Sequence, residues 1–334
     1  MGRPEAGLRI LSSSSRFPWC RGRGSVVYAP APMAAHPASP AARQRVVLGI
    51  VGGSGLYRMA ALADGTKVEL TTPFGAPSGP YTRATLPRPG AAPLDVVFLA
   101  RHGEGHRLLP TEVDYRANIH GFKQLGVTHL LSVSAVGSLR EEIVPGHVVF
   151  PDQFIDRTRT RASTFFGDGV VAHVQFGEPT TPAFRALARD AAARAGATIH
   201  DGGTLVVMEG PAFSTKAESH LYRSWGASII GMTALPEAKL AREAELGYAV
   251  LALATDYDCW HEAEAEVSVE AVMATVAHNV ELAQRSILEL VAALPQTTEE
   301  LPYPRACEFA TMTDRASISP AARQRLDLIL GHYL

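Results

Sequence analysis

Short apolar runs without charged residues recur along the chain, and each is followed by a loop of glycines or small polar residues. Such runs are typical of strands in a sheet that is covered on both faces. The predicted strands are 46–52, 94–100, 128–135, 146–151, 203–209, 227–233 and 248–255.

Stretches with apolar residues at helical spacing lie between these runs. Most of them follow a serine or threonine and end at a glycine, and one opens with Pro236 in its first turn. The predicted helices are 111–126, with a threonine cap, then 181–196, 215–226, 236–247 and 267–294. Strands that alternate with helices predict an α/β fold with a mostly parallel sheet.

Composition divides the chain into three parts. Residues 1–45 hold seven arginines and one acid, which predicts a disordered N-terminal extension, either a transit peptide or a translated upstream region before Met33. Residues 46–295 show no linker and no repeat, which indicates a single domain. Residues 296–334 are predicted to be a C-terminal tail with one short amphipathic helix.

The overall composition excludes several classes of partner. The chain has 334 residues, 46% of them hydrophobic, and a formal net charge of -2, so we expect neither nucleic acid nor a membrane surface as partner. The chain has no apolar run of about 18 residues, as a transmembrane helix needs. Its 3 cysteines are widely spaced, which indicates a reducing compartment such as the cytoplasm and no zinc pattern.

Three strand-end loops carry groups that could donate hydrogen bonds to an anion. The first is the glycine-rich "GIVGGSGL" with Ser54, the second is "LARHGEGH" with Arg101 and His102, and the third is "SVSAVGSL" with Ser134. The first loop could equally be a structural tight turn, and the second a solvated loop. The glycines in "HGEGH" disfavour the helix that a metal-binding histidine pair would need.

Three further loops offer a stacking ring, a hydroxyl and two carboxylates. Phe213 could stack on a flat ligand or belong to the core, and Thr233 could cap a helix or bind an anion. Asp256 and Asp258 follow a buried strand, where a solvated turn is the simple alternative. Because ligands bind beyond the carboxyl ends of parallel strands, we expect anion donors and acids to share one cleft.

Eight motifs in order make the chain resemble the nucleoside phosphorylase family, in particular its trimeric purine-nucleoside branch, over residues 46–295. The motifs are "GIVGGSGL", "ARHGEGH", "TEVDYRANI", "SAVGSLREEIVPG", "DQFIDRT", "EGPAFST", "GMTALPEAKLAREA" and "ATDYDCW". The resemblance implies a mixed, mostly parallel central sheet flanked by helices. It also implies phosphorolysis of S-methyl-5'-thioadenosine to adenine and 5-methylthioribose 1-phosphate, in purine and methionine salvage, by a cytoplasmic homotrimer. Inorganic phosphate is then a substrate, and no metal or organic cofactor is expected.

The resemblance also assigns site residues. The implied phosphate site comprises Ser54, Arg101, His102, Ser134, Ala135 and Thr233. The implied nucleoside site comprises Phe213, Ser214, Ile230, Met232, Asp256 and Asp258, with Val269 and Val272 around the methylthio group and His173 supplied by the neighbouring subunit.

The two aspartates are assigned the catalytic roles. Because positions i and i+2 of an extended chain face the same way, Asp256 and Asp258 are expected to approach one edge of the purine together. Asp256 is assigned to N7, where it holds or supplies a proton, and Asp258 mainly to the N6 amino group. The chain departs from the family at Ala212, where arginine is common, and at Gly231, where asparagine often stands.

Three alternatives remain open at the level of sequence. A phosphorylase for 6-oxopurine nucleosides or methylthioinosine would prefer an amide at Asp256, because a carbonyl oxygen needs a donor. A nicotinamide-binding oxidoreductase could use "GIVGGSGL", although that loop lacks the regular fingerprint spacing. A nucleoside-binding protein without activity would not need Arg101, His102 and Asp256.

Overall fold

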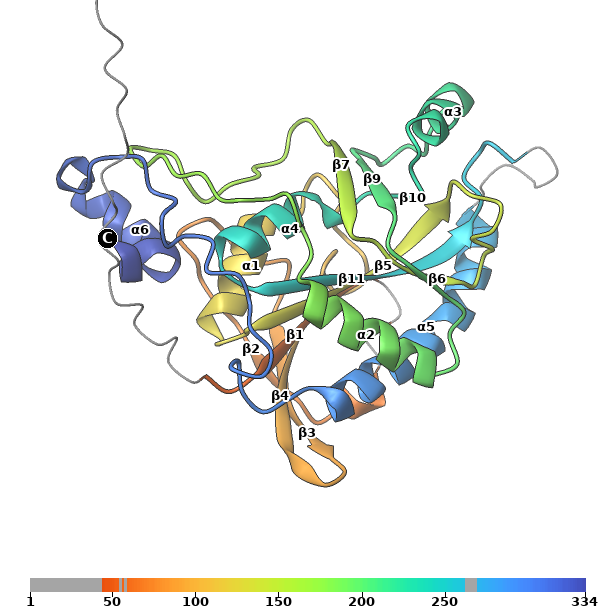
Figure 1. Ribbon diagram of the computed structural model, residues 1–334, viewed down its shortest axis with the longest axis horizontal. Helices are drawn as coiled ribbons and strands as arrows, with labels where there is room; N and C mark the ends of the chain where they lie inside the picture. The colour runs from red at the N-terminus through yellow and green to blue at the C-terminus, as the bar shows by residue number, and fades with distance from the viewer. Residues whose placement is uncertain (1–43, 54–55, 57–58, 262–268) are drawn as a thin grey trace, which may run out of the picture. The chain divides into compact units, whose positions relative to one another are not determined.

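A computed structural model describes residues 44–53, 56, 59–261 and 269–334, without the side chains of 269–274 and 276–278 (Figure 1). The predicted N-terminal extension, apart from its last residues, and Ser54 lie outside the described residues.

The centre of the fold is one mixed sheet. In the described part of the chain its main path runs β2-β3-β4-β1-β5-β10-β9-β7, and β11 pairs with both β5 and β6 while β6 pairs with β8. The strands are β1 (Val47–Gly52), β2 (Thr66–Val68), β3 (Tyr81–Arg88), β4 (Ala91–Ala100), β5 (His129–Ser138), β6 (Val148–Phe150), β7 (Gln153–Arg157), β8 (Ile199–Asp201), β9 (Thr204–Met208), β10 (Ile229–Gly231) and β11 (Gly247–Asp256). Neighbours β4, β1, β5 and β11 run parallel, whereas β10 and β6 run antiparallel to β5 and β11.

Helices cover both faces of this sheet. They are α1 (Tyr115–Gln124), α2 (Pro182–Arg194), α3 (Lys216–Ser224), α4 (Ala234–Glu243), α5 (Val269–Ala293) and α6 (Pro320–Leu330). Figure 1 shows α1 and α4 on one side of β5 and β11, and α2 and α5 on the other. The predicted α/β class with a mixed, mostly parallel sheet is therefore confirmed.

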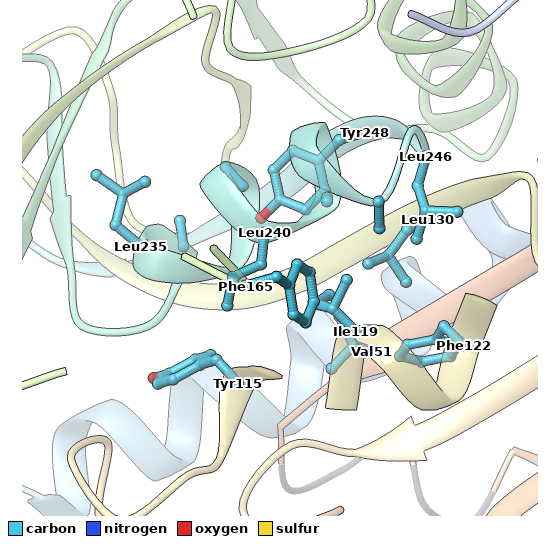
Figure 2. Close-up of a cluster of buried hydrophobic side chains, with 14 of the residues drawn as sticks. Val51, Tyr115, Ile119, Phe122, Leu130, Phe165, Leu235, Leu240, Leu246 and Tyr248 are labelled. Carbon is cyan, nitrogen blue, oxygen red and sulfur yellow. The ribbon is translucent and has the colours of Figure 1, made fainter. Parts of the chain in front are cut away.

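The central strands divide their side chains between two cores. In β11, Tyr248 and Val250 face the cluster with α1 and α4, whereas Ala249 and Leu251 face the cluster with α2 and α5. Alternate residues of a strand point to opposite faces, so a strand that is apolar throughout serves both cores. Figure 2 shows part of the first cluster, in which Phe165 and Ile119 lie between Tyr248 and the other labelled residues of α1, Tyr115 and Phe122.

One predicted helix start was wrong and another was confirmed. Helix α1 begins at Tyr115, because the Asp114 side chain accepts the N–H of Ala117, and not at a threonine cap. Helix α4 is assigned from Ala234, but Leu235 has an extended backbone (φ -122°, ψ 135°), so its regular part opens at Pro236, as predicted. Strands β2, β3, β7 and β8 were not predicted.

The C-terminal segment joins the first core. Ile318, Leu326 and Leu330, in and beside α6, belong to the same buried cluster as α1 and α4, and Figure 1 places α6 near α1. Residues 171–173 pair with 310–312 of this segment. Among the described residues, none of the helices combines the length and the apolar character that crossing a bilayer requires.

Candidate active site

A cavity of about 410 Å³ opens where the parallel strands β4, β1, β5 and β11 end. Its lining brings together most of the residues predicted from the sequence. These are Arg101, His102, Ser134, Ala135, Phe213, Ile230, Met232, Thr233, Asp256 and Asp258. Anion donors and acids therefore share one cavity, as the order of the parallel strands predicted.

The remaining predicted residues do not line the described cavity. Ser214 lies beside it, where its carbonyl accepts a hydrogen bond of 3.2 Å from the Cys259 thiol. His173 is exposed on a loop whose backbone N–H donates to the Ala310 carbonyl. Val269 and Val272 lie in α5, but their side chains, like all of Ser54, lie outside the described residues.

The two aspartates are joined by a turn and not by an extended strand, so the extended-chain explanation of their approach was wrong. Strand β11 ends at Asp256 after a bulge between Ala254 and Asp256. The next residues turn back, because Asp258 has a left-handed backbone (φ 51°) and its N–H donates to Asp256 Oδ1 over 2.8 Å. Both carboxylates still line the same cavity.

Burial changes the proton affinity of this pair. Burial raises the pKa of Asp256, and the nearby charge of Asp258 adds to that effect. Burial also raises the pKa of Asp258, although the nearby hydroxyls of Ser219 and Ser214 oppose that effect. The cavity thus offers two carboxyl groups that keep a proton to higher pH than a solvated aspartate does.

Gly137 makes room for the acids. A Cβ atom at this position of β5 would lie 2.9 Å from Asp256 Oδ1 and 3.1 Å from Ile230 Cγ2. Because Asp256 pairs with Gly137 across the bulge, only a residue without a side chain lets the carboxylate lie against β5. The sequence analysis did not identify this glycine as a site residue.

The guanidinium group of Arg101 is hydrogen-bonded mainly to other groups of the protein. Its guanidinium is buried and ion-paired through Nε to Glu237 Oε2 at 2.9 Å. The same guanidinium donates to the carbonyls of Val133 and Val51 and to the Ser132 hydroxyl. These contacts use four of its five N–H groups, so one hydrogen on Nη1 remains for a ligand. Most of the donor capacity of Arg101 is therefore used within the protein.

His102 is held in one tautomer. Its Nδ1 lies 2.9 Å from the Leu108 carbonyl, which accepts only, so Nδ1 carries the proton. Burial, and then the charge of Arg101, lowers the pKa of His102 to about 4. The imidazole is therefore neutral at physiological pH. Its ring stacks on that of His106 with centroids 4.3 Å apart.

Two hydroxyls complete the polar end of the cavity. Ser134 Oγ and Thr233 Oγ1 are 3.2 Å apart and lie on β5 and at the cap of α4. The arrangement can hold a tetrahedral oxyanion between β5 and α4.

Arg161 supports this end of the cavity and was missed. Its Nη1 donates to the carbonyls of Met232 (2.5 Å) and Leu235 (2.8 Å), which flank Thr233. Its Nη2 donates to the Glu209 carbonyl over 2.7 Å. The sequence has arginines at 157, 159 and 161, and their spacing does not distinguish the third from its neighbours.

Apolar groups form the other wall. Phe213 is 47% exposed in the described structure and lines the cavity together with Met208, Pro211 and Met232. An accessible ring beside sulfur-containing side chains offers a stacking surface for a flat heterocycle. The cavity therefore pairs a surface for an aromatic base with carboxylates at one edge and oxyanion donors at the other.

Comparison with known proteins agrees with this geometry. Residues 47–292 match the family model of the phosphorylase superfamily. Over 289 residues the chain is 56% identical to S-methyl-5'-thioadenosine phosphorylase of Geobacter sulfurreducens, covering 86% of this chain and 99% of that protein.

Solved structures show the same relationship. A methylthioadenosine phosphorylase from an antarctic soil metagenomic library superposes with a TM-score of 0.75 at 43% identity, covering 86% of this chain and 100% of the other. The methylthioadenosine phosphorylase of Schistosoma mansoni in complex with adenine gives a TM-score of 0.70 at 36% identity, covering 74% of this chain and 91% of the other. The resemblance seen in the sequence is thereby confirmed, and the chain belongs to the phosphorylase superfamily.

Proposed function

We propose that the protein catalyses phosphorolysis of S-methyl-5'-thioadenosine, which yields adenine and 5-methylthioribose 1-phosphate. The observation that carries the proposal is one cavity with Asp256 and Asp258 at one edge and the Ser134–Thr233 hydroxyl pair at the other. Relatives that bear the name of this activity support the choice of substrate.

The chemistry follows from the two ends of the cavity. Phosphate bound near Ser134 and Thr233 attacks the anomeric carbon as the bond to the base breaks, and its charge stabilises the oxocarbenium character of the sugar. Asp256, whose pKa burial raises, holds the proton that N7 of the departing adenine needs. General acid catalysis of this kind contributes about 10²–10⁴-fold. Asp258, which lines the same cavity, accepts a hydrogen bond from the amino group of the base.

The proposed reaction needs no further chemical group. Phosphate is the nucleophile and the base is the leaving group, so we expect neither a metal nor an organic cofactor. The reaction returns adenine to purine salvage and a phosphorylated thiosugar to methionine salvage. The small number of cysteines supports a cytoplasmic location.

One assay tests the proposed activity. The protein is incubated with methylthioadenosine, with and without phosphate, and adenine is measured. We expect adenine only when phosphate is present. Release of the base from inosine or methylthioinosine should be slower than release of adenine from methylthioadenosine. Adenine release without phosphate indicates a hydrolase. Release of 6-oxopurines alone indicates the alternative phosphorylase, and no release at all removes the proposal.

We further propose a homotrimer in which His173 reaches the 5' end of the nucleoside in the neighbouring subunit. The exposed position of His173 outside the cavity of its own chain supports this arrangement. The test mixes inactive Asp256→Ala chains with chains that carry His173→Trp, which is expected to block the neighbouring site. In mixed trimers, some sites combine the intact Asp256 of a His173→Trp chain with the intact His173 of an Asp256→Ala chain. These sites should be active. An active monomer in light scattering, or no recovery after verified subunit exchange, would refute the shared site.

A further inference from the structure

Helix α3 supports one wall of the cavity, although few of its own side chains are buried. It follows closely after Phe213, whose ring lines the cavity. In α3, all of which the structure describes, only Ser219 and Tyr222 are buried, and Leu221 is 44% exposed. Figure 1 shows the helix apart from the other helices. The position of this wall therefore depends on a small number of side chains.

Arg223 joins α3 to the turn that carries the two acids. Its guanidinium carbon lies 3.4 Å from the ring centroid of Trp260, well within the range of a cation–π contact. Its Nη1 donates to the Leu139 carbonyl over 2.6 Å. Trp260 is buried, and its Nε1 donates to the Ser138 carbonyl over 2.8 Å at the end of β5. One arginine thus connects the helix to the end of β5 and to a ring that lies shortly after Asp258 in the chain.

The ring of Trp260 belongs to a small apolar cluster behind the cavity. The cluster also contains Tyr222 of α3 and Ile230 of β10, and Ile230 lines the cavity as well. A second link lies nearby, because the Cys259 thiol donates to the Ser214 carbonyl over 3.2 Å. The support of the stacking wall and the support of the acids therefore meet in one place.

We propose that Arg223 is a positioning residue for base recognition, because it holds Trp260 against α3. In this way it sets the separation between the ring of Phe213 and the two carboxyl groups of the turn. The inference rests on the proposed function, in which the base lies between that ring and those acids. A flat heterocycle needs one particular separation, since its stacking contact and the hydrogen bonds at its edge must form together.

The experiment compares adenine binding with the use of phosphate in the full chain. Arg223→Met removes the cation and its N–H donors but keeps an unbranched side chain. In titration calorimetry, the dissociation constant of adenine should rise roughly tenfold, as expected when a partly buried cation–π contact is lost. KM for methylthioadenosine should rise by a similar factor. KM for phosphate should change little, because Ser134 and Thr233 lie within β5 and at the cap of α4.

Arg140→Met is the matched control. Arg140 is half-buried, like Arg223, and among the described residues its guanidinium donates to the carbonyls of Gly226 and Ala227, just beyond α3. The substitution removes hydrogen bonds of the same kind near the same helix end but leaves the stacked cation in place. Adenine affinity of this variant should equal that of the unmodified protein. Arg223→Lys keeps a charge near the ring and should recover part of the affinity that Arg223→Met loses.

A double-mutant cycle tests whether Arg223 acts through Trp260. Trp260→Leu alone should also weaken adenine binding. Arg223→Met should add little further loss in that background, because two residues that act through one contact are not additive. If Trp260→Leu does not fold, as judged by circular dichroism, the comparison of Arg223→Met with Arg140→Met decides the question.

Four results would overturn the inference. They are an unchanged adenine affinity in Arg223→Met, an equal loss in Arg140→Met, additive losses in the cycle, and equal rises in KM for both substrates. If the unmodified protein binds adenine but does not release it from methylthioadenosine, the proposed function fails and the adenine titrations still test Arg223. If the protein neither binds nor releases adenine, both proposals fail.

Discussion

The backbone N–H of Asp258 donates to Oδ1 of Asp256 over 2.8 Å, so the second aspartate fixes the carboxylate of the first. The Thr255 hydroxyl donates to the other oxygen, Oδ2, over 2.7 Å. Asp256 thus has a set orientation before any ligand arrives, which lowers the cost of placing it against a purine.

The first prediction concerns base preference. Asp256→Asn should lower turnover of methylthioadenosine and raise that of inosine-type nucleosides, because an amide donates where the acid accepts or holds a proton. A mismatched hydrogen bond costs about 1–3 kcal/mol, or roughly 5- to 150-fold in kcat/KM. The measurement is kcat/KM for both classes of base. An unchanged ratio between 6-amino and 6-oxo substrates would remove Asp256 from the recognition of the base.

The second prediction concerns the space beside Asp256. Gly137→Ala places a Cβ atom 2.9 Å from Asp256 Oδ1, so the carboxylate must move. KM for the nucleoside should rise, and kcat should fall, more than KM for phosphate changes. Gly231→Ala is the matched control, because its nearest neighbour, Val136 Cγ1, would lie 3.3 Å away. Equal kinetic effects of the two substitutions would show that Gly137 has no special relation to the acid.

The third prediction concerns the buried ion pair. Glu237→Gln leaves the Arg101 charge unbalanced, so the free energy of unfolding should fall by about 3–5 kcal/mol. Bound phosphate would then supply the missing negative charge. Added phosphate should therefore raise the Tm of this variant by more than it raises the Tm of the unmodified protein.

Glu289→Gln is the control for that experiment. The Arg194–Glu289 pair has a similar length, 3.0 Å, but its side chains are 47% and 43% exposed. Exposed pairs contribute about 0.2–1 kcal/mol, so little stability should be lost. If both variants lose the same stability and respond equally to phosphate, the charge of Arg101 is not balanced by Glu237 in the way described.

The fourth prediction concerns pH. Burial raises the pKa of Glu243 to about 7 from its ordinary 4.5, so the folded protein keeps a proton there that the unfolded chain loses. Stability from this group is therefore complete below pH 4.5 and is lost as the pH rises to about 7. At 1.36 kcal/mol for each pKa unit, the loss is about 3 kcal/mol.

Glu243→Gln removes this titration and can still meet its partners. An amide oxygen can accept the Phe165 N–H, and the amide N–H can donate to the Thr164 hydroxyl. Relative to the unmodified protein, the variant should gain stability between pH 4.5 and pH 8 in denaturant titrations. Glu289→Gln controls for the loss of one negative charge. Parallel stability curves for Glu243→Gln and the unmodified protein would contradict the prediction.

Local patterns in the sequence determined the framework of the fold. The central strands are uninterrupted apolar runs, because both of their faces are buried. An apolar run such as 248–255 is stable only as a strand that is covered on both faces. The gathering of Arg101, Ser134 and Asp256 at one edge followed from parallel strand order. The strands that were missed carry polar residues, as in "YTRATLPR" of β3 and "QFIDR" of β7, whose pattern does not differ from that of a loop.

Only the tertiary structure decided how the site residues are used. Arg101 and Glu237 are 136 positions apart, and no local pattern indicates that they form an ion pair. The proton on Nδ1 of His102 depends on a carbonyl that a loop brings back to the ring. The turn at Asp258 depends on the bulge in β11 and on the space above Gly137. Residue types and strand order set which groups meet, whereas the direction of each hydrogen bond depends on contacts between distant segments that form only on folding.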